Sequence, residues 1–300
     1  MVKQRNKKGS LPIGVRIIGI IIAVLAAAYG LYAGMGNSAG NFDGEMQIFA
    51  LDVGQGDSFF IISPNGKTML IDSGESSNSK QIEQFIREKG VRQLDVVIGS
   101  HTHSDHVGSM PYLLDAFDVG KYVMSEAGLE TRIQKRINAV LEEKDIPCSY
   151  VWAGDVIDWD SDCKVTVLSP VPEFDEYSKT DWNEWSLIIR AEYANHSMIF
   201  TGDATVRSEQ AAMLNNEKYL FDADVLKVPH HGSTTSSSLG FLEAVSPEYA
   251  IISVGKGNSY GHPDYDTIQK LKQVNAEIYR TDELGTINIV FSADDIKITY

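Results

Sequence analysis

Short apolar runs and alternating apolar and polar positions recur along most of this chain, separated by stretches with apolar residues at helical spacing. These runs predict strands over residues 46–53, 58–63, 67–72, 94–100, 121–125, 149–153, 163–169, 186–193, 197–201, 225–228, 250–254, 277–280, 287–291 and 296–300. Helical spacing predicts helices over residues 79–89, 110–117, 129–144, 208–215, 241–245 and 264–274. Because strands and helices interleave from residue 46 onwards, the pattern predicts an α/β fold of two βα layers, with sheets inside and helices outside.

The N-terminal pattern is different, because a basic flank precedes seventeen uncharged and mostly apolar residues, 17–33. That length is close to the roughly 20 residues that cross a bilayer, so we expect a transmembrane anchor. The alternative is a signal peptide cleaved near Ala26-Ala27-Ala28. Either segment would put the remainder of the chain outside the cell membrane, as a single-pass or a secreted protein. The expected organisation is a basic flank and anchor or signal segment (1–34), a Gly-rich linker (35–45) and one folded domain (46–300).

The charge composition of that domain limits the classes of molecule that it can bind tightly. Five of the 26 Lys and Arg residues and two of the 41 acidic residues precede Met46, which leaves the remainder with a net charge of −18. Such a charge disfavours tight binding along a nucleic-acid backbone, which relies on Lys and Arg to neutralise phosphates. Cys148 and Cys163 are the only cysteines, and both a disulfide and two reduced thiols are compatible with their positions. We expect no stable protein partner.

The strongest chemical signal is the segment His101-Thr102-His103-Ser104-Asp105-His106, directly after a predicted buried strand. Three of the seven histidines and one carboxylate fall within six residues. Imidazole nitrogen and carboxylate oxygen are ligands for Zn²⁺ and Mn²⁺. A tight loop after a strand can aim all four side chains into one pocket, so the segment predicts a metal site with two cations.

Other predicted strands also end in polar groups. Asp203 follows the strand 197–201, and the adjacent residues His230 and His231 follow the strand 225–228. A carboxylate at Asp203 could bridge two cations, although an Asp there could instead cap the following helix. Asp57, in a glycine-rich turn, and Asp72 are weaker candidates, because Gly-rich turns that contain Asp are common.

With these segments assembled, the chain from Met46 to Tyr300 resembles a metallo-β-lactamase-fold hydrolase, and more narrowly it is similar to the hydrolase domain of the ComEC-type competence proteins and their stand-alone relatives. The matching motifs are LDVGQGD (51–57), LIDSG (70–74), HTHSDHVGS (101–109), SLII (186–189), FTGD (200–203), LKVPHHGS (226–233) and YGHP (260–263). The histidine motif and HHGS are together highly specific, whereas LIDSG and SLII are weak alone.

The resemblance implies a four-layer αβ/βα sandwich with two divalent cations, Zn²⁺ or Mn²⁺, at one edge of the sheets. On the matching positions, His101 and His103 would hold one cation, and Asp105 and His106 the second. Asp203 would bridge both. His230 or His231 would complete the second site.

One departure from the family pattern concerns a further histidine ligand that many members supply before the bridging Asp. The only histidine in that interval is His196, at the start of the strand that Asp203 follows. Five to seven residues of strand span roughly 16–23 Å, so we expect His196 to be no ligand. Asn183 and Ser186 stand near the equivalent place. The first cation should then be held less tightly, which leaves Mn²⁺ as reasonable as Zn²⁺.

The function that follows is an exported or membrane-anchored hydrolase of phosphodiesters. Asp105 is expected to take a proton from the attacking water, and His262 to contact or protonate the substrate, although a structural role for His262 is equally compatible with its loop. Asp57, Ser233 and Asn258 are expected to contact the substrate. The resemblance points to DNA as that substrate. The alternatives are a small or cell-wall phosphoester and a metal-binding accessory protein without catalysis.

Overall fold

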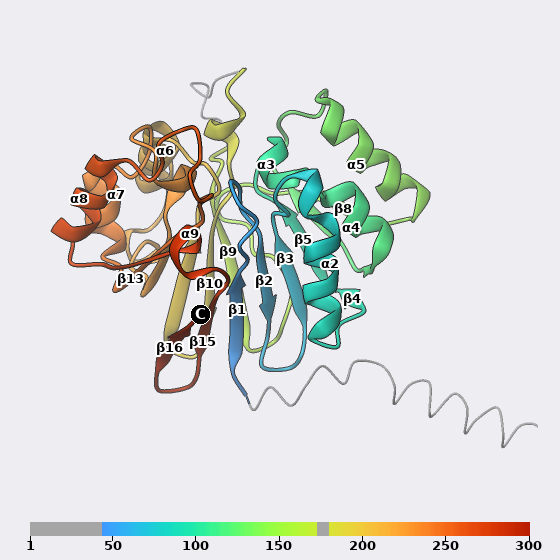
Figure 1. Cartoon of the computed structure of the whole chain (residues 1–300), viewed down its shortest axis with the longest axis horizontal. Helices are drawn as coiled ribbons and strands as arrows, with labels where there is room; N and C mark the ends of the chain where they lie inside the picture. The colour runs from blue at the N-terminus through green and yellow to red at the C-terminus, as the bar shows by residue number, and fades with distance from the viewer. Residues whose placement is uncertain (1–43, 173–179) are drawn as a thin grey trace, which may run out of the picture. The chain divides into compact units, whose positions relative to one another are not determined.

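Two β-sheets pack face to face between two sets of helices in the computed structural model, which describes residues 44–172 and 180–300 (Figure 1). The first sheet has eight strands in the order β16-β15-β1-β2-β3-β5-β7-β8. Their bounds are Met46–Ala50 (β1), Phe59–Ile62 (β2), Thr68–Ile71 (β3), Val96–Gly99 (β5), Tyr122–Met124 (β7), Cys148–Tyr150 (β8), Ile287–Phe291 (β15) and Ile296–Thr299 (β16).

The second sheet has six strands in the order β14-β13-β12-β11-β10-β9. They span Cys163–Ser169 (β9), Ile188–Tyr193 (β10), His196–Phe200 (β11), Val225–Lys227 (β12), Tyr249–Ile252 (β13) and Glu277–Arg280 (β14). A two-stranded ribbon of β4 (Gln93–Leu94) and β6 (Asp118–Val119) lies beside the first sheet.

Helices cover the outer face of each sheet. Against the first sheet pack α2 (Ser79–Glu88), α3 (Ser104–Val107), α4 (Met110–Ala116) and α5 (Arg132–Glu143). Against the second pack α6 (Val206–Asn215), α7 (Leu239–Val245) and α8 (Tyr265–Gln273). The remaining helical segments are α9 (Thr281–Leu284), η1 (Ser76–Asn78), η2 (Trp182–Trp185), η3 (Lys218–Leu220) and η4 (Pro229–Gly232).

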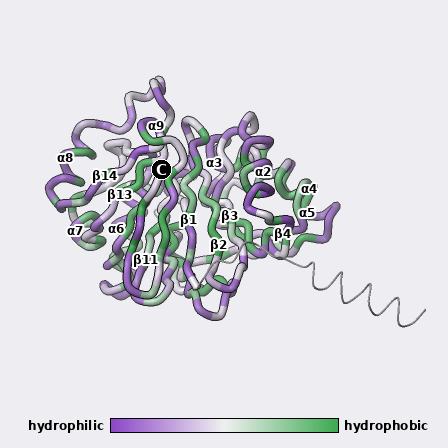
Figure 2. Tube along the Cα trace, turned by 60° about the horizontal axis from the view of Figure 1, so that its bottom comes forward, coloured by the Kyte–Doolittle hydropathy of each residue, from purple (hydrophilic) through white to green (hydrophobic). Residues whose placement is uncertain are grey.

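Burial follows the alternation of the strands. On β2, Ile61 faces the core between the two sheets, whereas Phe60 and Ile62 face the helices of the first sheet. On β12, Val225 belongs to the core between the sheets and Leu226 to the core under α6, α7 and α8. The three apolar cores therefore separate four layers, and hydrophobic residues concentrate along the central strands (Figure 2). The predicted four-layer α/β sandwich is confirmed.

Most predicted elements are present with shifted ends. The strand predicted over 46–53 ends at Ala50, and the helix predicted over 129–144 begins at Arg132, where the Thr131 side chain accepts a hydrogen bond from the Gln134 N–H. The hairpin of β2 and β3 forms as predicted. The structure adds that the last hairpin, β15–β16, returns to pair antiparallel with β1 in the first sheet. Cys148 and Cys163 are free thiols on strands of different sheets.

The predicted anchor or signal segment, 17–33, lies outside the described residues. Within the described ranges, none of the helices has the length and apolar character needed to cross a bilayer.

Candidate metal centre

The sequence motifs meet at one edge of the two sheets, where several strands end. Asp72 follows β3, the histidine loop follows β5, Asp203 follows β11 and the two adjacent histidines follow β12. Because β3 and β5 run parallel, as do β11 and β12, their carboxyl ends share an edge of each sheet. Packing the two sheets face to face brings these edges together.

Backbone contacts fix the histidine loop. The carbonyl of His103 accepts hydrogen bonds from the N–H groups of His106 and Val107, which starts α3. The N–H of Asp57 donates to the carbonyl of Asp105 at 3.1 Å. Gly56, at φ +135°, makes this close approach possible, because a Cβ there would lie 2.2 Å from the Asp105 carbonyl oxygen.

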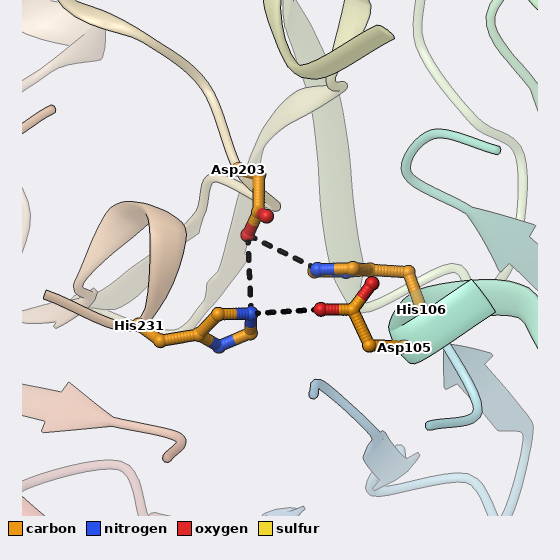
Figure 3. A group of neighbouring side chains, drawn as sticks. All are labelled: Asp105, His106, Asp203 and His231. Atoms are coloured by element: carbon orange, nitrogen blue, oxygen red, sulfur yellow. Dashed lines mark ion pairs between the residues drawn. The ribbon is translucent and has the colours of Figure 1, made fainter. Parts of the chain in front are cut away.

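Four side chains from three loops converge on one point, as Figure 3 shows. Asp203 Oδ1 lies 3.0 Å from His106 Nε2 and 3.6 Å from His231 Nε2, and His231 Nε2 lies 3.4 Å from Asp105 Oδ2. We call Asp105, His106, Asp203 and His231 the second ligand set.

The other oxygen of Asp203 faces a different group. Its Oδ2 lies 3.9 Å from His101 Nε2, which is itself 3.0 Å from His103 Nδ1. We call His101, His103 and Asp203 the first ligand set. One carboxylate thus belongs to both sets, and each set uses a different oxygen of it.

The adjacent residues His230 and His231 face different ligand sets. His231 joins the second ligand set, whereas His230 Nε2 lies 3.6 Å from Asp203 Oδ2, the oxygen of the first set. Both residues have φ above +50°, a strained conformation for a residue with a side chain. Two such residues in succession turn the chain sharply, so both imidazoles face the site.

The atoms present fit a pair of divalent cations. Metal–ligand bonds of 2.0–2.2 Å in a tetrahedral site place neighbouring donor atoms roughly 3.3–3.6 Å apart, close to the spacings in the second ligand set. Within the described residues, His106 Nε2, His231 Nε2 and Asp203 Oδ1 are buried without a hydrogen-bond partner. Buried polar atoms normally have one, and a cation would satisfy all three.

Hydrogen bonds behind the ligands orient the imidazoles. His106 Nδ1 donates to Asp72 Oδ2 at 2.8 Å, and His231 Nδ1 donates to the Ser253 carbonyl at 2.9 Å. Asp72 also accepts hydrogen bonds from the N–H and hydroxyl of Ser100. Such partners fix the tautomer and orientation of metal-binding histidines, so both imidazoles present Nε2 to the centre of the site.

Charges in the site alter the pKa values of these groups strongly. Burial alone would lower the pKa of His231, but the carboxylates of Asp203, Asp105 and Asp57 raise it to about 9. Burial would also lower the pKa of His106, but the carboxylates of Asp203, Asp57 and Asp72 raise that pKa well above its usual value. Burial favours a higher pKa for Asp203, yet His106 and His231 hold that pKa well below its usual value. In the absence of cations, these pKa shifts favour protonated imidazoles at the positions where cations would bind.

A cavity of about 300 Å³ opens above the ligands. Its walls are Gln55, His103, Ser104, Asp105, Asn183, Asp203, His230, His231, Tyr260 and His262. The Tyr260 ring stacks on His262, with ring centroids 5.7 Å apart. Burial lowers the pKa of His262, as does the neighbouring His230, so this imidazole is neutral at pH 7. Among the described residues, no Lys or Arg lines this cavity.

Asp57, Ser233 and Asn258, which the sequence predicts to contact the substrate, are not among the residues that line this cavity. Asp57 is 2% exposed and pairs with Lys227 beneath the ligands. Ser233 is buried and its hydroxyl accepts hydrogen bonds from Thr235. The Asn258 side chain bonds the backbone of Gly255, Tyr260 and His262. Polar side chains in loops near a site suggested substrate contacts, whereas their hydrogen bonds hold the loops themselves.

His196 begins β11, at the opposite end of that strand from Asp203, as the sequence indicated. Sequence reasoning assigned no role to Lys227 and treated Asp72 as weak. The alternation of β12 was the usable signal for Lys227, because it places that residue on the same inner face as Val225. Asn183, which stands near the place of the missing family histidine, lines the cavity together with Gln55 of the LDVGQGD motif.

Comparison with known proteins agrees with this geometry. Residues 51–256 match the Metallo-beta-lactamase superfamily. ComE operon protein 3 of Bacillus subtilis (strain 168) is 34% identical over 260 residues, which cover 81% of this chain and 33% of that protein. Recombination protein 2 of Haemophilus influenzae is 29% identical over 257 residues, covering 84% and 30%. The chain thus spans about a third of the length of these relatives.

Solved structures share the fold at low identity. Igni18, a metallo hydrolase from Ignicoccus hospitalis, superposes with a TM-score of 0.54 at 14% identity and covers 82% of this chain and all of its own. CmlA, a diiron β-hydroxylase from Streptomyces venezuelae, gives a TM-score of 0.51 at 12% identity, covering 78% of this chain and 52% of its own. With the family match, the fold and the ligand geometry in agreement, the chain belongs to the metallo-β-lactamase superfamily, and within it resembles the ComEC-type competence proteins.

Proposed function

We propose that this protein is a metal-dependent hydrolase of phosphodiesters. The observation that carries the proposal is the sharing of Asp203 between two ligand sets, through a different oxygen for each. Fold alone does not decide the reaction, and one similar structure is a β-hydroxylase. The donor set of imidazoles and carboxylates, open to a cavity, is the feature that favours hydrolysis.

The residues divide between two cations, Zn²⁺ or Mn²⁺. His101, His103 and Asp203 would hold the first, and Asp105, His106, Asp203 and His231 the second. His230 would face the first cation from the cavity side and take the place of the histidine that the family supplies before the bridging Asp. Two divalent cations in such a site supply hydroxide at neutral pH and neutralise charge in the transition state.

The side chains around the cavity then position the substrate and move protons. Asp105 is the most exposed carboxylate of the second ligand set, at 27% of its side chain, so it can accept a proton from a water in the cavity. His262 lies beside His230, with ring centroids 5.8 Å apart. A neutral imidazole there can donate an N–H to a phosphate or leaving-group oxygen.

The charge of the cavity favours a particular kind of phosphodiester. Because its walls carry no Lys or Arg among the described residues and the whole chain has a net charge of −15, duplex DNA would find few partners for its phosphates. We therefore propose a small phosphodiester, or the end of a single DNA strand, as the group that enters. A wall-polymer phosphoester shares this chemistry. Residues 17–33 would anchor the enzyme to the cell membrane, with the catalytic domain outside.

Metal analysis combined with one assay tests the proposal. The purified protein should carry about two Zn²⁺ or Mn²⁺ per chain and hydrolyse bis-p-nitrophenyl phosphate. Asp105→Ala should reduce turnover by roughly 10²–10⁴-fold, the usual contribution of a general base, while Asp266→Asn on the exposed face of α8 should retain it. Bound metal without turnover of this ester or of DNA would instead favour an accessory protein, and full activity of Asp105→Ala would refute the assigned site.

A further inference from the structure

Lys227 is a buried lysine directly beneath the metal centre. It is 1% exposed, and no other lysine among the described residues is buried. Strand β12 explains this position, because Val225 faces the core between the sheets, Leu226 faces the helices, and Lys227 returns to the inner face where the strand ends. Lysine is almost never fully buried unless its charge is paired, so its partners explain why it is there.

Its ammonium group reaches two partners that belong to different parts of the site. Lys227 Nζ donates to the carbonyl oxygen of Gly202 at 2.8 Å, and Gly202 directly precedes the bridging residue Asp203. The same carbonyl accepts a hydrogen bond from the N–H of His230. Lys227 therefore holds the turn from which both Asp203 and His230 project.

The second partner is the carboxylate of Asp57, which forms a buried ion pair with Lys227. Asp57 Oδ1 lies 3.4 Å from His231 Nδ1, and its Oδ2 lies 3.6 Å from His106 Nδ1. Both are the nitrogens that face away from the centre of the site. Lys227 thus holds the Asp57 carboxylate that lies behind both histidines of the second ligand set.

We propose that Lys227 is a positioning residue of the second metal site. It ties the turn of Asp203 to the carboxylate behind His106 and His231, so three of the four ligands of that set keep their places relative to one another. Neither Gly202 nor Asp57 lines the cavity, so Lys227 acts through the ligands. The inference rests on the two-metal site proposed above but not on the identity of the substrate.

A purely structural ion pair makes a different prediction. Replacing both partners of a buried pair by uncharged residues is often neutral for stability, whereas removing one partner leaves a buried charge unpaired and is strongly destabilising. If Lys227 served only to neutralise Asp57, removing both charges should restore stability and metal binding together. If Lys227 positions the ligands, removing both charges should restore stability alone.

The test compares Lys227→Met, Lys227→Met/Asp57→Asn and Asp57→Asn in the full chain. Lys270→Met is the matched control, because Lys270 also donates to a backbone carbonyl, that of Ser237 at 2.8 Å, away from the metal ligands. Metal per chain is measured after dialysis, and Zn²⁺ and Mn²⁺ dissociation constants are measured by competition with a chromogenic chelator. Thermal melting in EDTA reports the stability of each metal-free variant.

We expect the double variant to melt near the wild-type temperature in EDTA while it binds the second cation roughly 10–100-fold more weakly, the usual loss when a partner behind a metal ligand is removed. The dissociation constant of the first cation should change less, and Lys270→Met should match the wild type. Lys227→Met should lose affinity and also melt at a lower temperature; if it does not fold, the double variant decides.

Wild-type affinity for both cations in the folded double variant, or the same loss in Asp57→Asn as in the double variant, would overturn the role of Lys227. A wild-type protein that binds two cations without hydrolysing phosphodiesters would instead refute the proposed function and leave this inference intact.

Discussion

The carboxylate of Asp203 is the residue on which both ligand sets depend. Its Oδ1 faces His106 and His231, and its Oδ2 faces His101 and His230. It is 2% exposed, and imidazoles on two sides keep its pKa well below the usual value despite its burial. A single substitution here should therefore affect two cations at once.

Asp203→Asn should remove the negative charge shared by both sets and replace the donor oxygen of one set by an NH2 group, so the metal content should fall from about two per chain to one or fewer. The cations would stabilise the transition state by several kcal/mol, so their loss should lower kcat by roughly 10³-fold or more. Metal analysis and turnover of bis-p-nitrophenyl phosphate measure both effects. Two retained cations in Asp203→Asn would contradict the shared-ligand geometry.

The pH dependence of metal binding follows from His231. Its pKa in the metal-free protein is raised to about 9, against an ordinary value of about 6.5, and only the neutral imidazole binds a cation. Apparent metal affinity should therefore rise as pH increases from 6.5 towards 9, by about tenfold per unit for each proton released. Chelator competition at pH 6.5, 7.5 and 8.5 measures this slope, and a flat profile would contradict it.

The same raised pKa affects the metal-free protein in the opposite direction. A group whose pKa is higher in the folded state contributes stability that is fully present below its unfolded pKa and is lost as pH rises through the folded value. The melting temperature in EDTA should accordingly fall between about pH 6.5 and 9. A rise over this interval would mean that other groups control stability.

Loops that follow strands of both sheets form the site, and their close packing depends on how these elements are arranged rather than on any single ligand. The turn after β1 touches the histidine loop through Gly56 and the Asp105 carbonyl. The loop after β13 meets the same turn, because the Ser253 hydroxyl donates to the Gly56 carbonyl at 2.8 Å. Gly56 therefore joins loops from the two sheets.

Gly56→Ala should displace the Asp105 backbone, because the new Cβ would lie 2.2 Å from its carbonyl oxygen. Gly154→Ala is the control, since Gly154 also has positive φ (+97°), but a Cβ at that position would have no heavy atom beyond its chain neighbours within 4 Å. The control should lose about 1–2 kcal/mol of unfolding free energy from backbone strain alone. Gly56→Ala should lose about 1–3 kcal/mol more and weaken metal binding as well, as urea unfolding and chelator competition would reveal.

At the scale of the whole molecule, the fold concentrates buried negative charge at the edge of the two sheets where the ligand sets lie. Asp57, Asp72 and Asp203 are at most 2% exposed, Asp105 lies beside them, and Lys227 is the only lysine buried with them among the described residues. The four carboxylates and the Lys227 ammonium together carry a charge of −3. Two divalent cations and one hydroxide would add +3 and neutralise this group. Metal should therefore stabilise the folded protein as a whole.

Removal of metal by EDTA should lower the melting temperature of the intact chain. A ligand that binds only the folded state adds about 2.7 kcal/mol at a free concentration 100 times its dissociation constant. Thermal melting at fixed pH, with EDTA and with increasing Zn²⁺ or Mn²⁺, measures the shift. Equal melting temperatures at saturating metal and in EDTA would argue against binding by the folded site.

Local chemistry along the chain was sufficient to predict much of this protein. The apolar pattern predicted the interleaved strands and helices, since alternation depends only on which face of a strand is buried. The ligand candidates from His101 to His106, Asp203 and His231 were predictable because ligand-type residues follow directly on buried strands. The family resemblance added their pairing.

Tertiary structure decided what depends on residues far apart in sequence. His230 and His231 face different oxygens of Asp203 because both residues have positive φ angles. Histidine does not by itself indicate such a backbone conformation, so the sequence could not predict this arrangement. The pairing of Lys227 with Asp57 joins a strand of the second sheet to a turn of the first, and Asp72 gains its role only through His106. A buried charge is tolerated only beside its partner, and the partner is known only once the two sheets have packed together.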